Sequence, residues 1–333
     1  MSSGSRLTLR RAAPYGGVLL LGLIAFLLPQ ASPTSFVLSL ATTALIYAIA
    51  AAGLGFLWGQ SGQLSLAHAA VFGIGAYTAA ICAKQFGLGF AASLPISTGV
   101  GLVAGALVAL PSLRTSGHYF VILTFAVSEV ISVVEMRWES LTGGVNGITT
   151  LPGAQTLFGL RLAGRADYYS VVVIFAVVVF LVLCFLMRSR WGILLRSMRE
   201  NPDLSTSLGI NVPINRVIVF ALSGAIAALA GQLYLYHVKS IAPEAFMSNL
   251  SIVFLLVVLL GGKSYLLGPA AGAIIYVFLP EYIGLSPVRS QIAFGVILVI
   301  MILTAPDGVI SLIGRLRGRL RESLRGPRTE AGA

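Results

Sequence analysis

Long apolar runs, separated by short polar or Pro/Gly-containing breaks, constrain this chain more than any other feature of its sequence. A helix needs ~20 residues to cross a hydrocarbon core of ~30 Å. In lipid every backbone polar group needs an internal partner, which a helix supplies. The sequence therefore predicts an all-α, polytopic membrane protein of about ten transmembrane helices, within a range of eight to ten. The expected spans lie near residues 12–28, 36–57, 67–83, 92–110, 118–136, 168–187, 217–236, 249–262, 265–283 and 290–305.

The composition excludes an ordinary soluble domain. The 333 residues are 57% hydrophobic and only 10% charged, whereas a soluble chain carries roughly 25% charged residues to solvate its surface. Cys82 and Cys184 lie in separate apolar runs, without the Cys/His spacing that is typical of a metal site. We therefore expect buried free cysteines and no metal.

The basic residues test the predicted topology. With the N-terminus in the cytoplasm and one crossing per apolar run, most of the 22 Lys and Arg residues fall on the cytoplasmic side, as the positive-inside rule requires. This sorting favours a protein of the bacterial inner membrane with an even number of spans and both termini cytoplasmic. It also accounts for the net charge of +11 without a nucleic-acid partner. The basic residues expected on the outer side are Lys84, Arg137, Arg161, Arg165, Lys239 and Arg289.

We expect one transmembrane domain over residues 1–314, followed by a basic, disordered cytoplasmic tail over 315–333. The arginines of the tail suit contact with anionic lipid. The first apolar run has an alternative interpretation, because a basic start, an apolar stretch and small residues near 30–32 also fit a cleaved signal peptide. Cleavage would leave every later span unchanged.

Two glycine-interrupted regions indicate broken helices, one in each half of the chain. One covers residues 53–73 and the other 261–272, and each joins an apolar segment to the helix that follows. Paired broken helices in corresponding positions are typical of transporters built from inverted internal repeats, where the breaks line the pathway. The sequence therefore predicts inverted repeats with glycine-broken helices, although the two regions share little beyond their glycines.

The longest cytoplasmic connection, residues 188–216, has the pattern of a coupling loop. Leu194, Leu195 and Met198 are spaced for one helical face. Asn201-Pro202-Asp203 can start a second helix with proline in its first turn, and Gly209 can end it. Such a helix suits docking into a groove on a cytoplasmic partner. An ordinary helix at the membrane interface remains the alternative.

Polar residues at membrane depth are costly and mark functional positions. Glu129 is such a residue, and a hydrogen-bonded structural carboxylate is the alternative. Gln63, Ser65 and His68 lie at the first broken helix, where free backbone N–H groups can meet a substrate carboxylate. The alternative is that these backbone N–H groups are hydrogen-bonded to protein groups within the break.

Two enzyme motifs are incomplete. Gly262–Ser264 resembles the end of a phosphate-binding loop, but Val257 occupies the position of its first glycine. Residues 59–62 match the GxSG of intramembrane serine proteases, which need His118 or His237 within reach of Ser61. The predicted topology places neither histidine in mid-span opposite Ser61. We therefore expect no enzyme, and ATP must be bound elsewhere.

Several motifs in order resemble the permeases of branched-chain amino acid ABC importers, over roughly residues 40–310. The stretch Thr142–Gly147 is similar to the M-type subunit of that family rather than its H-type paralogue. The matching segments are 59–70 (GQSGQLSLAHAA), 72–77 (FGIGAY), 141–148 (LTGGVNGI), 208–211 (LGIN), 259–262 (LLGG), 267–269 (LGP) and 306–308 (PDG).

The resemblance implies a permease subunit that itself binds no cofactor. Its expected partners are a second, H-type permease, two cytoplasmic ATP-binding subunits that hold ATP and Mg²⁺, and a periplasmic substrate-binding protein. The resemblance assigns coupling to the ATPase to Arg196, Arg199, Glu200 and Gly209. We assign the substrate pathway to Gln63, Ser65, His68, Glu129, Thr142 and Asn146.

The sequence departs from the family pattern at two positions. Lys263 places a charge in a turn that is usually small and neutral, and Ala67 stands where glycine is common. These differences leave the substrate open between branched-chain amino acids and urea or short amides. A stand-alone channel or ion-coupled carrier is the alternative class, and it predicts paired intramembrane charges where the sequence offers mainly Glu129.

Overall fold

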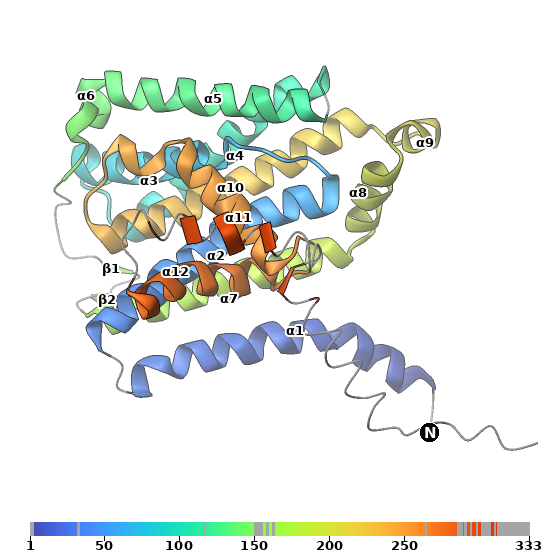
Figure 1. The fold of residues 1–333 in the computed structure, drawn as a ribbon, viewed down its shortest axis with the longest axis horizontal. Coiled ribbons are helices and arrows are strands. Elements are labelled where there is room, and N and C mark those ends of the chain that lie inside the picture. Colours follow the sequence, from blue (N-terminus) through green and yellow to red (C-terminus); the bar gives the residue numbers. More distant parts are fainter. Residues whose placement is uncertain are drawn as a thin grey trace, which may run out of the picture.

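Long helices running along one bundle form most of the described chain (Figure 1). The computed structural model describes residues 3–31, 34–115, 117–149, 156–157, 160–161, 164–263 and 265–284, and isolated residues between 289 and 311. The helices of the bundle are α1 (Ser3–Leu27), α2 (Ser35–Ser61), α3 (His68–Phe86), α4 (Phe90–Ala109), α5 (His118–Arg137), α7 (Arg165–Arg188), α10 (Val212–Val238), α11 (Ser248–Gly261) and α12 (Gly268–Ile283).

These helices confirm the prediction of a polytopic all-α membrane protein. Among the described residues, seven helices are long and apolar enough to span a membrane, and Tyr15–Leu27 and Gly268–Ile283 are shorter apolar helices. Each lies close to an expected span. The tenth expected span, 290–305, falls largely outside the described residues.

Short elements connect the helices at the two ends of the bundle. One end carries α8 (Arg190–Glu200) and α9 (Pro202–Ser207), which lie at the same end as the start of α1 (Figure 1). At the opposite end, Ile148 and Ile241 pair through their backbones. The other short elements are η1 (Leu28–Ala31), η2 (Leu110–Leu113), α6 (Glu139–Thr142), η3 (Gly144–Asn146), η4 (Pro243–Phe246) and the antiparallel pair β1 (Thr156–Leu157) and β2 (Leu160–Arg161).

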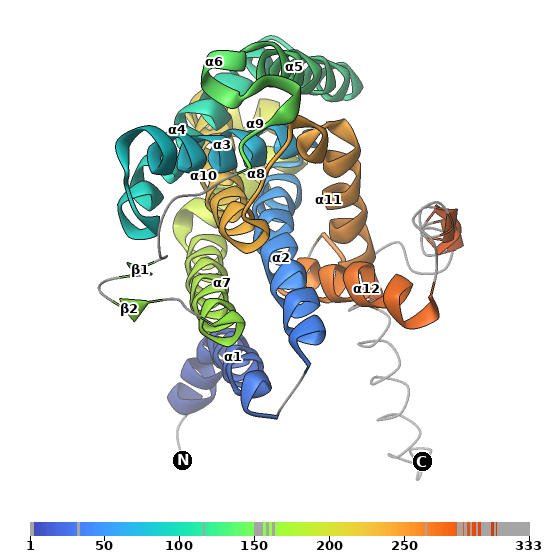
Figure 2. The ribbon, with the colours of Figure 1, turned by 90° about the vertical axis from the view of Figure 1, so that its left-hand side faces the viewer.

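Viewed along the bundle, α2 and α7 lie between α1 and the layer formed by α3, α4 and α10, and α5 lies on the far side of that layer (Figure 2). Small residues let α3, α4 and α10 approach closely. A side chain at Gly101 would collide with Ala228, and one at Gly105 with the carbonyl of Phe220. Because lipid supplies no hydrophobic force between helices, such close backbone contact holds the bundle together.

Both predicted helix breaks are confirmed, and they meet. Gly62 ends α2 with φ of 74°, a short non-helical segment follows, and α3 begins at His68. The second break, residues 262–267, separates α11 from α12. A side chain at Gly59 would collide with the carbonyl of Lys263, and Gly55 lies against the ring of Pro269. The inverted-repeat relation between the two regions stays a prediction.

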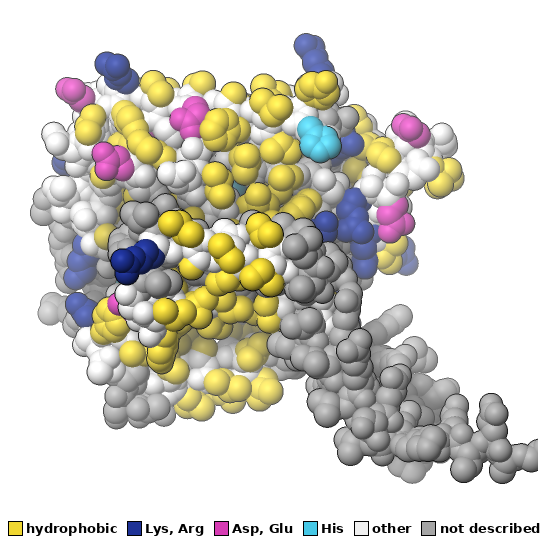
Figure 3. Space-filling view, viewed as in Figure 1, with side chains coloured by type: hydrophobic (Ala, Val, Ile, Leu, Met, Phe, Trp, Pro, Cys, Tyr) yellow, Lys and Arg dark blue, Asp and Glu magenta, His cyan; other side chains and the backbone are white. Residues whose placement is uncertain are grey.

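Hydrophobic side chains cover much of the middle of the face shown in Figure 3, and charged groups gather mainly toward the two ends. The end with α8 and α9 carries the described basic residues that the predicted topology placed in the cytoplasm. They are Arg114, Arg188, Arg190, Arg196, Arg199, Arg216 and Lys263.

Candidate substrate pathway and coupling segment

The first helix break is held by side chains from three helices. The hydroxyl of Thr124, on α5, accepts a hydrogen bond from the backbone N–H of Leu66 (3.1 Å). The hydroxyl of Ser251, on α11, accepts one from the N–H of Ala69 (3.0 Å). His68 Nε2 lies 2.8 Å from the carbonyl oxygen of Ala50, in the middle of α2. In this conformation the backbone N–H groups of Leu66 and Ala69 therefore have protein partners.

Of the predicted pathway residues, the structure brings Gln63, Ser65 and His68 together at this break. Ser65 and His68 are buried, and the Ser65 hydroxyl accepts from the N–H of Ala67 (3.2 Å). Gln63 is 9% exposed, and its Oε1 has no hydrogen-bond partner among the described residues. Gln63 thus differs from its neighbours, because buried amide oxygens are normally paired.

A polar stripe on α5 faces the interior of the bundle. Thr124, Ser128, Ser132 and Glu135 are all buried and recur every three or four residues, so they share one helical face. Neighbouring positions such as Val130 are exposed and apolar. This arrangement inverts the amphipathicity of a soluble surface helix. It is the pattern expected for a helix with lipid on one side and a polar interior on the other.

Much of this stripe has unmet hydrogen-bonding capacity. The hydroxyls of Ser128 and Ser132, both carboxyl oxygens of Glu135 and the hydroxyl of Tyr77 are buried without a hydrogen-bond partner among the described residues. Glu135 is 5% exposed and lies against Gly73 of α3. An unpaired buried polar group costs ~1–3 kcal/mol, and more when it is charged. A row of them therefore indicates a place for water or a polar solute.

The Thr142–Gly147 motif closes the same end of α5. The Thr142 hydroxyl donates to the carbonyl oxygens of Glu135 (2.6 Å) and Trp138 (2.8 Å) and accepts from the N–H of Gly144 (3.2 Å). Thr142 therefore fixes the backbone at the C-terminal end of α5. Asn146 is exposed in η3, and Glu129 is half-buried on α5.

Sequence reasoning singled out Glu129 and overlooked Ser128, Ser132, Glu135 and Tyr77. The spacing of Thr124, Ser128, Ser132 and Glu135 is the signal that identifies the stripe, because these residues share one helical face. The pathway assignment itself, including that of Glu129, stays a prediction.

A second polar site lies at the end of the bundle that carries α8 and α9. It is a cavity of about 310 Å³ between the first helix break, the start of α5, the α8–α9 junction and the start of α10. Ser61 and His118 both line it, but the Ser61 hydroxyl donates to the carbonyl of Leu57 (2.6 Å). No hydrogen bond joins Ser61 to His118 in the described part of the chain, so they do not form a nucleophile–base pair.

The segment predicted to couple to a partner, residues 188–216, contains two short helices, α8 and α9, and its coupling role stays a prediction. Leu195 and Met198 are buried, whereas Arg196, Arg199 and Glu200 are exposed. The Asn201 side chain accepts from the N–H of Leu204 (2.9 Å) and so caps α9, whose first residue is Pro202. Gly209 follows α9 with φ of 83°, a conformation that favours glycine.

Two contacts fix the coupling segment to the bundle. Arg199 Nη1 donates to the carbonyl of Gly59 (2.5 Å), next to the first break. Trp191 Nε1 donates to Asn215 Oδ1 at the start of α10 (2.8 Å). Beyond these contacts, α9 projects from the bundle (Figure 1) and exposes Leu204 and Leu208, which are 58% and 74% exposed. The segment therefore joins an exposed apolar tip to the broken helix.

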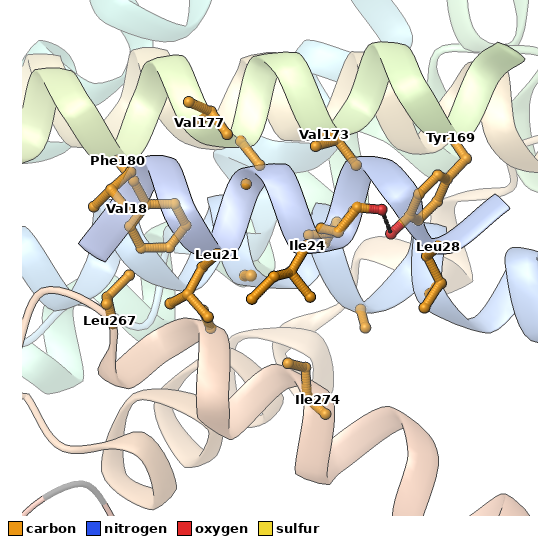
Figure 4. Close-up of a pocket in the computed structure, with 18 of the residues that line it drawn as sticks. Val18, Leu21, Ile24, Leu28, Tyr169, Val173, Val177, Phe180, Leu267 and Ile274 are labelled. Carbon is orange, nitrogen blue, oxygen red and sulfur yellow. Dashed lines mark hydrogen bonds between the residues drawn. The ribbon is translucent and has the colours of Figure 1, made fainter. Parts of the chain in front are cut away.

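A second, apolar cavity does not suit a polar solute. It has a volume of about 350 Å³ and lies between α1, α2, α7 and α12 (Figure 4). Its lining is apolar apart from Tyr169, whose hydroxyl donates to the carbonyl of Ala25 (2.9 Å). Gly262 and Lys263 lie between α11 and α12, and Lys263 Nζ lies 4.6 Å from the centre of the Trp58 ring.

Comparison with known proteins decides the family. Residues 36–305 match the family described as branched-chain amino acid transport system, permease component. The chain belongs to this family of transport permeases. It is 29% identical to the high-affinity branched-chain amino acid transport system permease protein LivM of Escherichia coli, over 82% of this chain and 69% of that protein. Identity to the LivM of Salmonella typhimurium is 30%, with the same coverage.

A more distant relative carries the name of the paralogue. The probable branched-chain amino acid transport permease protein LivH of Methanocaldococcus jannaschii is 26% identical over 71% of this chain and 79% of that protein. No solved structure matches this chain. The comparisons confirm the resemblance stated above, and the permease family is one of transport proteins rather than catalytic enzymes.

Proposed function

We propose that this permease is one of two membrane subunits of an ATP-driven importer of branched-chain or related small amino acids, in the bacterial inner membrane. Its partners are a second, H-type permease, two cytoplasmic ATP-binding subunits that hold ATP and Mg²⁺, and a periplasmic binding protein. The names of its LivM and LivH relatives support this assembly. The end of the bundle with α8 and α9 faces the cytoplasm, together with both termini.

The exposed tip of α9 is the observation that carries the proposal. Leu204 lies on α9 and Leu208 caps its C-terminal end, with the Leu208 N–H bonded to the Leu204 carbonyl, and both side chains are exposed. A short helix with an exposed apolar face suits a groove on a partner protein. Closure of the ATP-binding subunits moves this helix, and the contact between Arg199 and Gly59 passes the movement to the first helix break.

The polar stripe on α5 supplies the route across the membrane. The binding protein releases the amino acid at the end that carries Glu135 and Thr142. The unpartnered oxygens of Ser128 and Ser132 accept polar contacts from the solute as the helices move. The broken helix with Gln63, Ser65 and His68 lies between this stripe and the cytoplasmic side.

The experiment measures leucine uptake by proteoliposomes that contain the complete transporter and its binding protein. The Leu208→Asp variant places a charge in the docking contact and is expected to abolish ATP-dependent uptake. Leu113→Asp is the matched control, because Leu113 is also exposed at this end but lies in η2. Equal loss in both variants would contradict docking through α9. ATP-independent uptake by this chain alone would instead support the carrier alternative.

A further inference from the structure

Small side chains open the apolar cavity between α1, α2, α7 and α12 (Figure 4). Ala41, Ala44 and Ala48 line it from α2, at a spacing that places them on one helical face, and all three are buried. The space in front of them amounts to about 350 Å³. Protein interiors are close-packed, with few voids larger than a water molecule. A space of this size is large enough for part of another molecule.

The chemistry of the lining selects an apolar occupant. Tyr169 is the only polar side chain among the described lining residues, and its hydroxyl already donates to the carbonyl of Ala25 (2.9 Å). Those lining residues include no charged side chain. A buried water molecule needs about two to four polar partners, which this lining does not offer. The lining therefore disfavours water and polar solutes and suits hydrocarbon.

The cavity opens toward the lipid. Leu21 and Ile24 on α1 and Ile274 on α12 line it, and these three side chains are exposed. In a membrane-spanning chain, exposed apolar side chains of this kind face acyl chains. A helix from a partner subunit would not fit, because a helix with its side chains is about 10–12 Å wide, and ~15 Å of its length fills more than about 1,000 Å³. A single acyl chain is narrow enough to enter between α1 and α12.

The depth of the cavity matches one leaflet of the bilayer. Its lining runs on α1 from Val18 to Leu28 and on α7 from Tyr169 to Phe180. At ~1.5 Å per residue these stretches are about 15–17 Å long. The hydrocarbon core is ~30 Å thick, so half of it is about as deep as the cavity. The Leu28 and Tyr169 end is the one opposite α8 and α9, because α7 runs from Tyr169 toward α8.

A positive charge lies beyond that end. Arg165 is exposed one turn before Tyr169 on α7, and its Nη1 donates to the carbonyl of Ser35 at the start of α2 (3.4 Å). A guanidinium group has five N–H donors and no acceptor, so this bond leaves donors for an anion. The neighbouring acidic residue, Asp167, accepts from the N–H of Gly164 (3.1 Å). Arginine is well suited to bind phosphate through two N–H groups.

We propose that a phospholipid is a structural ligand of this chain, with one acyl chain in the cavity and its phosphate at Arg165. The lipid belongs to the outer leaflet, an assignment that rests on the proposed orientation of the bundle. Its acyl chain fills the space between the alanine face of α2 and the gap between α1 and α12. The lipid thereby holds α1 against the rest of the bundle.

The test uses phosphatidylglycerol with a photoreactive diazirine at the end of one acyl chain, in phosphatidylethanolamine vesicles that contain the assembled transporter. After irradiation, adducts are mapped by mass spectrometry of peptides. We expect adducts at Val18 and Phe180, which are buried and line the deep end of the cavity. A diazirine close to the glycerol is expected to label Leu28 and Tyr169 instead.

Two results of this mapping would overturn the proposal. One is a set of adducts confined to exposed side chains outside the cavity, such as Ile122 and Val130 on α5, because lipid that merely surrounds the protein would produce it. The other is the reverse order of depth, with the chain end at Tyr169, because the phosphate could then not lie at Arg165.

Matched variants assign the site to its residues. Ala44→Leu fills the cavity and is expected to abolish the buried adducts, whereas Ala92→Leu, at an exposed position of α4 outside the lining, leaves them unchanged. Arg165→Gln is expected to lower the yield of buried adducts about fivefold, since one arginine contributes on the order of 1 kcal/mol to the binding of anionic lipid. Arg137→Gln removes an exposed arginine at the end of α5 and serves as its control.

Buried adducts that persist in Ala44→Leu, or that disappear equally in Ala92→Leu, would refute the cavity as the site. Equal losses in Arg165→Gln and Arg137→Gln would refute the phosphate contact. The labelling requires neither ATP nor a transported solute. A transporter that fails to import leucine would therefore contradict the proposed function and leave the result for the lipid site unchanged.

Discussion

Replacing Arg199 by alanine is expected to separate ATP hydrolysis from transport. The Arg199 guanidinium donates to the carbonyl of Gly59 (2.5 Å), and the aliphatic part of the side chain lies against Gly62. This contact joins the coupling segment to the end of α2, beside the first helix break. Without it, the ATP-binding subunits still move α9, but less of that movement reaches the pathway.

The size of the effect follows from the contact. A hydrogen bond from a charged donor contributes ~1.5–3 kcal/mol, so we expect uptake to fall by about 10-fold to 150-fold. ATP hydrolysis should change much less, because Leu204 on α9 and Leu208 at its end keep their positions. Both rates are measured in the same proteoliposomes, and the ratio of ATP hydrolysed to leucine imported reports the coupling.

Arg196 is the matched comparison on the same helix: the resemblance assigns it to coupling as well, but its hydrogen bonds stay local, so we expect no effect on coupling. Its Nε donates to the carbonyl of Gly192 (3.2 Å) and its Nη2 to that of Met187 (3.0 Å), so both contacts stay within α7 and α8. Surface changes of this kind cost within ~0.5 kcal/mol, or about twofold in a rate or equilibrium. An unchanged ratio in Arg199→Ala, or an equal rise in Arg196→Ala, would refute the reasoning.

Two further outcomes test the pathway and the packing of the bundle. Ser132→Cys, on the polar stripe, is expected to react with a small membrane-impermeant thiol reagent, whereas Val130→Cys, on the lipid-facing side, is not. Equal labelling of the two cysteines would show that water does not reach the stripe selectively. Gly101→Ala would place a methyl group against Ala228 and is expected to cost ~1–3 kcal/mol of stability. Gly99→Ala has open space and should keep or raise the unfolding temperature in detergent, because alanine is the better helix former, so equal losses in both variants would contradict the packing account.

The spans and breaks were predictable because they depend on local properties of the chain. Apolar length sets the spans through the thickness of the bilayer. Gly62 and Gly262 take backbone conformations with positive φ, so glycine marks both breaks. The Asn201-Pro202 start of α9 likewise needs only local capping chemistry.

The polar contacts between distant helices were not predictable from local pattern alone. The pairing of Thr124 with Leu66, and of Ser251 with Ala69, joins residues far apart in the sequence. Such pairs depend on how α5 and α11 sit against the first break, which no local motif specifies. For the same reason Glu129 drew attention instead of Glu135, since their burial differs only once α5 is placed against α3.

The most direct test of the account is a photo-crosslinking residue at position 208 in the assembled transporter. Leu208 is exposed at the tip of the coupling segment, so we predict an adduct with the ATP-binding subunit, and one that is absent when the photoreactive residue is at position 113 instead. Adducts with lipid alone, or with the periplasmic binding protein, would contradict the claim that an ATP-binding partner drives this permease through α9.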